Sequence, residues 1–367
     1  MKPVILFESY PDFSGSPLEI YNELVKRGYD KKYDLIWAVY STFNEKTNYK
    51  VVKFHGCNSL EKQQILARTK VIIDSNRYIY KPRPDVFRLH TRHGTNLKKA
   101  LGYSRGIGPV DAMLSTSEAM IEIDKIVYPP QVASKSIPLG LPVNDLLFHH
   151  KDLYANGFMK AVTGTDKKFN KIFLWLPTYR QHRNNPSIGS KFIQPYGFPL
   201  FRNEAEAVKV NDELVKSNSV MLCQFHHAQA KNYKPLPKCS NMIFITEDMK
   251  RNFNITLADL LGFADAMITD YSSVYYEFLL LNKPVALSVD DLVEYNRAVG
   301  FCYNYLQWLK GEYLINISAL IKFIDDVSNG IDRLKDSRTA FMNKIYKFRD
   351  DKSTQRVVDF LIKNAKI

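Results

Sequence analysis

Short runs of apolar residues alternate with longer amphipathic stretches in the first half of the chain. Apolar side chains recur every three or four positions in Pro17–Arg27, which predicts a helix with one face on a core. Leu60–Arg68 is predicted to be helical too, and Ser117 is placed to cap a further helix. The apolar runs predict strands at Val4–Phe7, Asp34–Val39, Val71–Asp74, Phe87–His90 and Ala112–Ser115. Strands that alternate with helices indicate βαβ units and a parallel sheet.

The alternation pauses over residues 149–170, which are rich in Lys, His, Asp, Asn and Gly, and then restarts. Strands are predicted at Lys171–Leu176, Val220–Phe225, Met242–Ile245, Ala266–Thr269 and Pro284–Leu287. Helices are predicted at Glu204–Ser217, Leu257–Phe263 and Ser273–Leu281, with a long loop over 181–199 and a helical tail from Ile315. We therefore expect an α/β protein with two Rossmann-like domains, whose parallel sheets face a central cleft.

We expect the first domain to cover residues 1–160 and the second 161–345, with a C-terminal helix at 346–367 that could pack back on the first. A length of 367 residues suits two domains, and 45% hydrophobic with 24% charged residues is typical of a globular protein. The formal net charge of +13 favours a polyanionic partner: nucleic acid, a phosphate-rich ligand or an anionic membrane surface.

The four cysteines are far apart and form no C-x-x-C pair, so neither a structural zinc site nor a disulfide framework is expected. The apolar run at Val4–Phe7 is too short for the core of a signal peptide, and no stretch approaches the length of a membrane span. We therefore expect a protein of the cytoplasm that lies against a membrane if it meets one at all.

Two predicted strand ends carry histidines. His93 precedes Gly94 in a loop, where an imidazole is suited to proton transfer near neutral pH. His226 and His227 follow another strand, and only one of two adjacent side chains normally faces a cleft. The alternatives are a histidine that only hydrogen-bonds its own turn and a pair split between core and solvent. No third ligand lies at the spacing of a zinc site.

Two further strand ends have groups suited to phosphate. Asp270 ends one strand, and Ser272 and Ser273 lie where the free N–H groups of the next helix gather. Arg180 follows another strand and offers a planar fork for phosphate oxygens. An ordinary helix cap and a surface arginine are the alternatives.

Together these segments resemble the CDP-glycerol glycerophosphotransferase family, the polyol-phosphate transferases of teichoic acid and capsule assembly. The matching segments are His93-Gly94-Thr95 with Leu97-Lys98 and Leu101-Gly102, Gly140 to Asp145, Pro177 to Arg180, His226, Thr269 to Ser273 with Lys283 to Val285, and Tyr295 to Tyr305. They follow the family's order over residues 70–310. The family often has Trp where this chain has Arg92, and Arg where it has Val299, with Arg297 two positions away.

The resemblance implies a GT-B-like fold with an acceptor-side N-terminal domain and a CDP-donor-binding C-terminal domain. A hydroxyl of a glycan or lipid-linked acceptor would attack the β-phosphorus of a CDP-polyol, and CMP would leave. CDP-glycerol is the first choice of donor. His93 would act as the general base, and His226 would be the second catalytic residue, in contact with the pyrophosphate. Asp270 is expected to orient its loop, because its charge would repel a phosphate unless a divalent cation intervenes.

The resemblance implies further residues at the site. Those expected to bind the donor phosphates or CDP are Arg180, Thr269, Asp270, Ser272 and Ser273. The further candidates for substrate binding are Gly94, Thr95, Lys98, Asn144, Asp145, His227 and Arg297. No cofactor and no protein-bound metal are expected, and a divalent cation carried by the CDP-polyol is left open.

Two other functions stay open. A glycosyltransferase of the same architecture would use a nucleotide sugar and attack its anomeric carbon. A non-catalytic, basic polyanion-binding protein would explain the charge, but the chain has no RNA-binding or helix-turn-helix motif, so nucleic acid becomes the third choice of partner. The positive excess then fits phosphate-rich substrates and peripheral association with the anionic inner face of the cell membrane.

Overall fold

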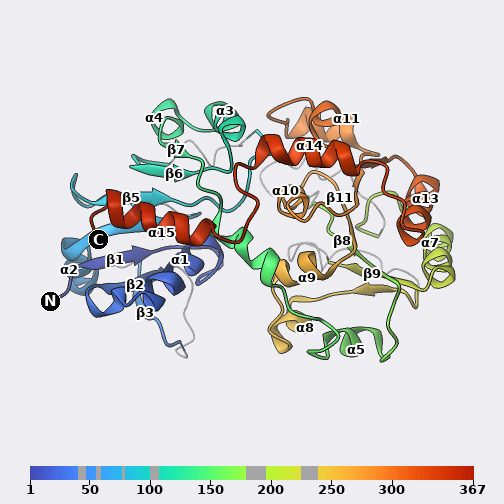
Figure 1. The fold of residues 1–367 in the computed structure, drawn as a ribbon, viewed down its shortest axis with the longest axis horizontal. Coiled ribbons are helices and arrows are strands. Elements are labelled where there is room, and N and C mark those ends of the chain that lie inside the picture. The colour runs from blue at the N-terminus through green and yellow to red at the C-terminus, as the bar shows by residue number, and fades with distance from the viewer. Residues whose placement is uncertain (40–46, 55–58, 77–78, 100–106, 179–195, 225–238) are drawn as a thin grey trace. The chain divides into compact units, whose positions relative to one another are not determined.

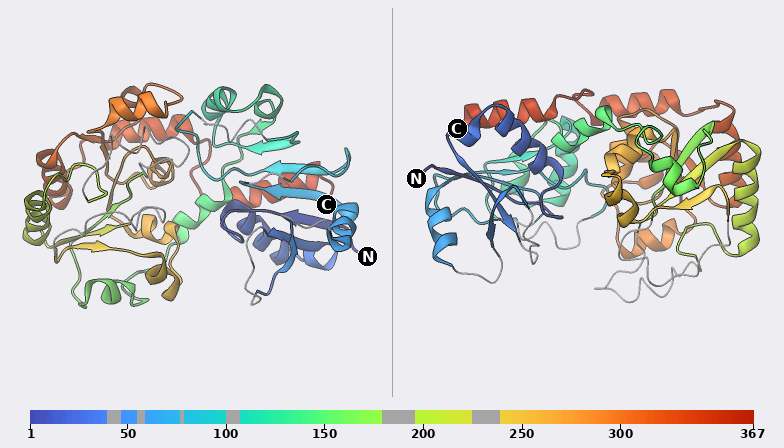
Figure 2. Two further views of the ribbon diagram at one scale, coloured as in Figure 1. Left: turned by 180° about the vertical axis from the view of Figure 1, so that it is seen from behind. Right: turned by 90° about the horizontal axis from the view of Figure 1, so that it is seen from below.

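The computed structural model describes residues 1–39, 47–54, 59–76, 79–99, 107–178, 196–224 and 239–367 (Figure 1). The chain folds into two compact units. Unit 1 consists of Met1–Asn96, Ala100–Leu146 and Lys344–Ile367, and unit 2 consists of Leu97–Lys99 and Leu147–Asn343. Each unit is built on one parallel sheet with helices on both of its faces (Figures 1 and 2).

The sheet of unit 1 has seven described strands in the order β3-β2-β1-β4-β5-β6-β7, and every pair is parallel. The strands are β1 (Val4–Phe7), β2 (Asp34–Val39), β3 (Lys50–Lys53), β4 (Thr69–Asp74), β5 (Phe87–His90), β6 (Ala112–Leu114) and β7 (Ser136–Ile137). The order reverses between β1 and β4, which is the switch point where doubly wound sheets bind ligands.

Helices cover both faces of this sheet. They are α1 (Gly15–Lys26), η1 (Tyr29–Lys31), α2 (Leu60–Arg68), α3 (Glu118–Val127), α4 (Pro130–Ala133), η3 (Pro142–His149) and α15 (Ser353–Asn364). Ile5 and Phe7 join the core on which α1 and α15 pack, whereas Val4 and Leu6 face the core on the α2 side. A strand buried on both faces is apolar at every position, and this is why Val4–Phe7 has no alternation.

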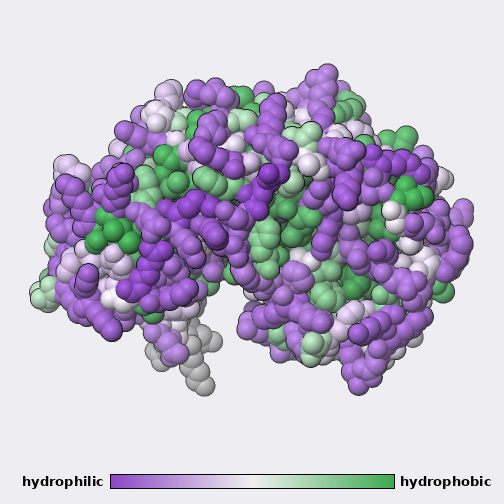
Figure 3. All heavy atoms as spheres, viewed as in Figure 1, coloured by the Kyte–Doolittle hydropathy of each residue, from purple (hydrophilic) through white to green (hydrophobic). Residues whose placement is uncertain are grey.

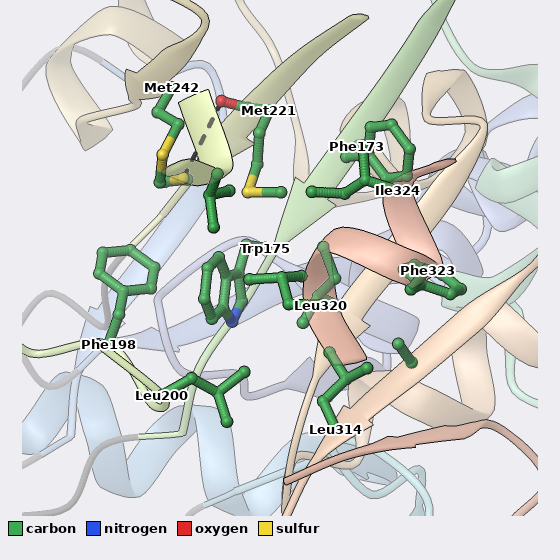
Figure 4. Packing of buried hydrophobic residues seen from close by; sticks show 14 of the residues in the cluster. Phe173, Trp175, Phe198, Leu200, Met221, Met242, Leu314, Leu320, Phe323 and Ile324 are labelled. Carbon is green, nitrogen blue, oxygen red and sulfur yellow. Dashed lines mark hydrogen bonds between the residues drawn. The ribbon is translucent and has the colours of Figure 1, made fainter. Parts of the chain in front are cut away.

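Unit 2 repeats the topology with six described strands in the order β10-β9-β8-β11-β12-β13, again all parallel. The strands are β8 (Lys171–Trp175), β9 (Ser219–Cys223), β10 (Met242–Phe244), β11 (Ala266–Thr269), β12 (Val285–Ser288) and β13 (Glu312–Leu314). The switch point lies between β8 and β11. Trp175 of β8 packs between Phe198 and Leu320 in the core (Figure 4).

The helices of unit 2 follow the second series of strands. They are α5 (Phe158–Thr163), α7 (Glu204–Lys216), α8 (Glu247–Asn252), α9 (Leu257–Phe263), α10 (Val274–Leu279), α11 (Leu292–Ala298), α12 (Tyr305–Trp308), α13 (Ile317–Ser328) and α14 (Lys335–Ile345). No described helix has the length and apolarity needed to span a membrane. Hydrophilic side chains dominate the visible face, and apolar ones form scattered patches (Figure 3).

The compact units divide at other residues than the domain limits expected from the sequence, 160 and 345. The first division falls after Leu146, because α5 packs on unit 2, where Phe158 contacts Phe253 edge to face. The chain returns to unit 1 at Lys344, and α15 then packs along α1, with Arg27 bonded to Asp359. A unit boundary inside a polar connecting stretch leaves no periodic signal in the sequence. The position of this boundary becomes clear only from the packing of α5 within unit 2.

Candidate active site

A buried charge cluster lies at the end of β4 in unit 1. The Asp74 carboxylate accepts a bond from Arg88 Nε at 2.8 Å and pairs with His90 Nδ1 at 2.7 Å, both from β5. All three side chains are almost wholly buried. Burial by itself would raise the pKa of Asp74, but the Arg88 and His90 partners hold it below its usual value. The carboxylate therefore stays ionised and fixes the end of β5, where the His93 loop begins.

His93 is exposed on the loop that leaves β5, whereas the residues before it are buried. Thr91 ties the loop to β4, since its N–H and its hydroxyl both donate to the Asp74 carbonyl, at 2.7 and 3.0 Å. Desolvation lowers the pKa of His93, the charges of His90 and Arg92 lower it further, and a backbone hydrogen bond with Ser75 opposes them. The result is an accessible imidazole whose neutral, proton-accepting form is favoured.

Ser75 is itself fixed at the switch point of unit 1. Glu8, the residue after β1, is buried, and its Oε2 accepts the N–H groups of Ser75 and Asn76, both at 3.2 Å. A peptide held on one side by Glu8 can orient the His93 ring on the other, so that a single ring nitrogen is left for proton transfer. Neither Glu8 nor Asp74 was among the site residues predicted from the sequence. Each is nevertheless an acidic residue at the end of an apolar strand, and the same signal identified Asp270.

The loop after β11 in unit 2 is held by its own acidic residue. Asp270 is fully buried, and its two carboxylate oxygens accept the N–H of Thr178 at 2.9 and 3.0 Å. The Thr269 hydroxyl donates to the Leu176 carbonyl at 2.8 Å. These bonds join the segment after β8 to the segment after β11 across the switch point. Asp270 and Thr269 therefore shape the loop, whereas Ser272 and Ser273 remain partly accessible.

Aromatic residues support this loop from beneath. The Tyr271 ring stacks on Tyr295 with centroids 4.1 Å apart, and Phe301 packs on Tyr305 at 4.8 Å. The Tyr305 hydroxyl donates to the Asp270 carbonyl at 2.7 Å. Such contacts fix the loop backbone by shape rather than by charge.

The segment that follows the His93 loop belongs to unit 2. Lys98 pairs with Phe301 in an antiparallel bridge, and its ammonium lies 5.6 Å from the centroid of the Tyr295 ring. Lys98 is thus placed beside the aromatic residues under the Asp270 loop. Arg297, on α11, is exposed to solvent.

Asn144 and Asp145 are buried in unit 1, and the hydrogen bonds of the Asp145 carboxylate lead to α15. Asp145 accepts the N–H groups of Ser353 and Thr354 at 3.0 and 2.7 Å, so it caps the start of α15. Gly140 has a φ of +87°, and a Cβ there would lie 2.5 Å from Ser353 Oγ, so only glycine lets α15 begin here. This structural role accounts for the Gly140–Asp145 segment, and a contact of Asn144 and Asp145 with substrate stays a prediction.

Gly94 and Thr95 continue the His93 turn, with a Gly94 φ of +148° and a buried Thr95. Arg180, His226 and His227 lie outside the described residues. The strands that lead toward them are β8 and β9, which are neighbours in the sheet and end at Trp175 and Cys223.

Two doubly wound parallel sheets, each with fixed polar loops at its switch point, define an α/β protein of the GT-B-like class. The structure of the wall teichoic acid polymerase TagF has the same fold, with a TM-score of 0.74 and 21% identity over 99% of this chain and 89% of that chain. The sequence matches the model of the CDP-glycerol:poly(glycerophosphate) glycerophosphotransferase family over residues 1–363. The chain therefore belongs to that family.

Curated relatives differ in the polyol that their names give. The ribitol-phosphate polymerase TarL of Staphylococcus aureus is 26% identical over 96% of this chain, which spans 60% of TarL's length. The teichoic acid glycerol-phosphate primase of Bacillus subtilis is also 26% identical, over 96% of this chain and 81% of its own. The match therefore covers nearly all of this chain but only part of TarL.

Proposed function

We propose that this chain transfers a polyol phosphate from a CDP-polyol to a hydroxyl of a cell-surface glycan or teichoic-acid-type acceptor, with release of CMP. The observation that carries the proposal is the family match over residues 1–363, together with an accessible imidazole in unit 1 and a pre-formed hydroxyl loop in unit 2. Glycerol phosphate is the first expectation for the transferred group, since a TagF structure was soaked with CDP-glycerol.

In the proposed reaction, the acceptor oxygen forms a bond to the β-phosphorus, and the bond from that phosphorus to the bridging oxygen breaks. The bridging oxygen leaves with CMP, and the acceptor proton passes to the free ring nitrogen of His93. His93 suits this role because its pKa is lowered and its ring reaches solvent. The acid–base step is one of two requirements, and the other is stabilisation of charge on the phosphoryl oxygens.

The phosphate contacts are assigned to unit 2. The hydroxyl groups of Ser272 and Ser273, in the loop that Asp270 shapes, would donate hydrogen bonds to the phosphate oxygens. Arg180 and His226 would add positive or dipolar groups. In the described part of the chain, no cluster of three or more His, Cys, Asp and Glu side chains could hold a metal ion. Any divalent cation in the reaction would therefore be sought first on the donor's phosphates.

We also propose that the protein works against an anionic membrane surface, where lipid-linked acceptors are found. The net charge of +13 supports this, since each basic residue near an anionic surface adds about 1 kcal/mol of attraction. Binding to vesicles with and without anionic lipid tests this part of the proposal. Equal binding to both would contradict it.

A donor screen tests the activity itself. The purified chain would be incubated with CDP-glycerol, CDP-ribitol and UDP-sugars, each with a teichoic-acid-type acceptor, and the released nucleotide identified by mass. Release of CMP that requires acceptor supports polyol-phosphate transfer, and the better CDP donor names the polyol. Release of UDP alone would replace the proposal by a glycosyltransferase.

A further inference from the structure

One buried carboxylate holds both ends of the His93 turn. Asp124, in α3, accepts a bond at its Oδ1 from Arg92 Nη1 at 2.7 Å and another from Asn96 Nδ2 at 3.2 Å. Arg92 precedes the His93–Thr95 turn and Asn96 follows it. Because both donors meet the same oxygen, the two ends of the turn are drawn to one point on α3.

The turn needs such a restraint because its backbone is strained. Arg92 has a φ of +64°, a region that residues with a Cβ seldom adopt and that costs free energy unless surrounding contacts enforce it. Arg92 as a whole is 4% exposed, and a second bond joins its Nη1 to the Leu114 carbonyl at 3.3 Å. Its guanidinium also lies 5.5 Å from the centroid of the Tyr128 ring. The side chain is thus fixed well enough to hold the backbone.

The Arg92 guanidinium keeps its charge inside the protein. Asp124 is fully buried and α3 is oriented by its Ser117 cap, whose hydroxyl accepts the Met120 N–H. Burial alone would lower the pKa of Arg92, but the Asp124 charge raises it, so the guanidinium stays positive. Burying two charges brings little net stability, and breaking such a pair is costly. The buried Arg92–Asp124 pair lies next to the exposed His93, which indicates that the pair has a role other than stabilising the fold.

We propose that Asp124 is a positioning residue for His93: through Arg92 and Asn96 it holds the turn in the one conformation that presents the imidazole for proton transfer. The proposal rests on the proposed function, because it takes His93 as the base. Asp124 itself belongs to none of the motifs identified in the sequence. A misplacement of a reacting group by about 1 Å can lower turnover about a hundredfold.

The first test compares Asp124→Asn with Glu122→Gln, a neutralised carboxylate that is exposed on the same helix. For Asp124→Asn we expect kcat to fall by about 10- to 100-fold, since the turn loses its shared charged acceptor. The affinity for CDP should stay within twofold, because the donor loop lies in unit 2. Glu122→Gln should leave both unchanged.

The second test separates positioning from simple loss of stability. In the double variant Arg92→Met with Asp124→Leu, apolar side chains replace both buried charges, so that Tm should recover toward the wild-type value. We expect kcat to stay low in that variant, because nothing then draws the two ends of the turn together. Recovery of kcat together with Tm would overturn the proposal, since it would show that only stability had been lost.

A third readout needs no substrate. The His93 imidazole can be followed by NMR in protein with labelled histidine, with His93→Gln for assignment. We expect a single ring environment in the wild type and a shifted or multiple one in Asp124→Asn. An unchanged signal with kcat within twofold would overturn the proposal. If the wild type turns over no CDP-polyol, the proposed function fails, whereas the NMR comparison still decides whether Asp124 positions His93.

Discussion

Units 1 and 2 have the same strand order but hold their switch-point loops in different ways. In unit 1 the His93 loop lies among buried polar contacts: the ion pairs of Asp74 with Arg88 and of Asp124 with Arg92, and the hydrogen bond between Asp74 and His90. In unit 2 the loop after β11 is held by one carboxylate bonded to backbone N–H groups and by packed tyrosines. A shared topology therefore fixes where a site forms but not how its groups are fixed.

The difference agrees with what each loop is proposed to do. A side chain that takes up a proton needs charges around it, because they set its pKa and its orientation. A loop that binds phosphates needs donors at fixed positions, and rigid aromatic packing helps to fix them without adding a further charge to that of Asp270. If the two loops are separable in this way, a substitution in one should leave the role of the other intact.

The largest effect is expected from His93→Ala. Loss of the general base should lower kcat by about 10²- to 10⁴-fold, while CDP affinity remains near that of the wild type. Steady-state rates and calorimetric CDP binding measure the two quantities separately. An equal loss of both would contradict the assignment of His93 as the base.

The pH profile of the wild type sharpens the same point. His93 acts as a base only when neutral, and its pKa is lowered from 6.5 by partial desolvation of the ring and by the charges of His90 and Arg92. Activity should therefore rise with pH through a limb whose midpoint lies below 6.5. A midpoint clearly above that value in the pH dependence of kcat/KM would exclude this environment for the base.

The next effect is expected from Asp74→Asn, which leaves Arg88 and the end of β5 without their buried partner. Breaking a buried pair in this way costs about 3–5 kcal/mol in the free energy of unfolding. Because the folded-state pKa of Asp74 is lowered, its contribution is present above the pKa of the unfolded chain and is lost as pH falls through the folded value.

Urea unfolding of Asp74→Asn and wild type at several pH values tests this. The gap between the two proteins should narrow as the pH falls toward that range. A gap that stays constant with pH would show that Asp74 does not carry the charge assigned to it. Lys70–Asp85, an exposed pair in the same unit, offers a matched control, and Asp85→Asn should change stability far less.

Most of the central strands could be predicted from the sequence because each is buried on two faces. Val4–Phe7, Asp34–Val39, Phe87–His90 and Ala266–Thr269 have the predicted bounds. Three edge strands, β3, β7 and β13, were missed. All three strands are short. The sequence of β3 is Lys-Val-Val-Lys, and its polar ends are typical of an edge strand, which buries little surface and is kept polar. A search for continuous apolar runs passes over such strands.

The site could be predicted only in part, for a similar reason. His93 and Asp270 each stand next to a strand end and a loop signal, so local sequence was enough to select them. The pairing of Arg92 with Asp124 joins positions 32 residues apart, and only the packing of α3 beside β7 brings them together. Arg92 was visible as a departure from the family pattern, but its partner was not.

A smaller effect is expected from Ser273→Ala. Within the described part of the chain the Ser273 side chain makes no capping hydrogen bond, so the substitution should leave Tm nearly unchanged. Donor affinity should fall by about tenfold, the value of one hydrogen bond to a charged phosphate oxygen. Titration of CDP-glycerol with His93→Ala as background would measure it without turnover. Unaltered affinity would count against the phosphate loop.

The smallest effect is expected from Tyr305→Phe, which keeps the ring among its aromatic neighbours and removes only the hydroxyl bonded to the Asp270 carbonyl. One such bond contributes about 1 kcal/mol to stability. Tyr313→Phe is the control, because its hydroxyl also donates to backbone carbonyls of unit 2, those of Leu306 and Leu309, but not to the loop after β11. Both variants should lose similar stability in thermal unfolding, and only Tyr305→Phe should also weaken CDP binding, by about two- to threefold. If both variants weaken CDP binding alike, the Tyr305 hydroxyl contributes general stability rather than loop geometry, and its bond to the Asp270 carbonyl does not position the loop after β11.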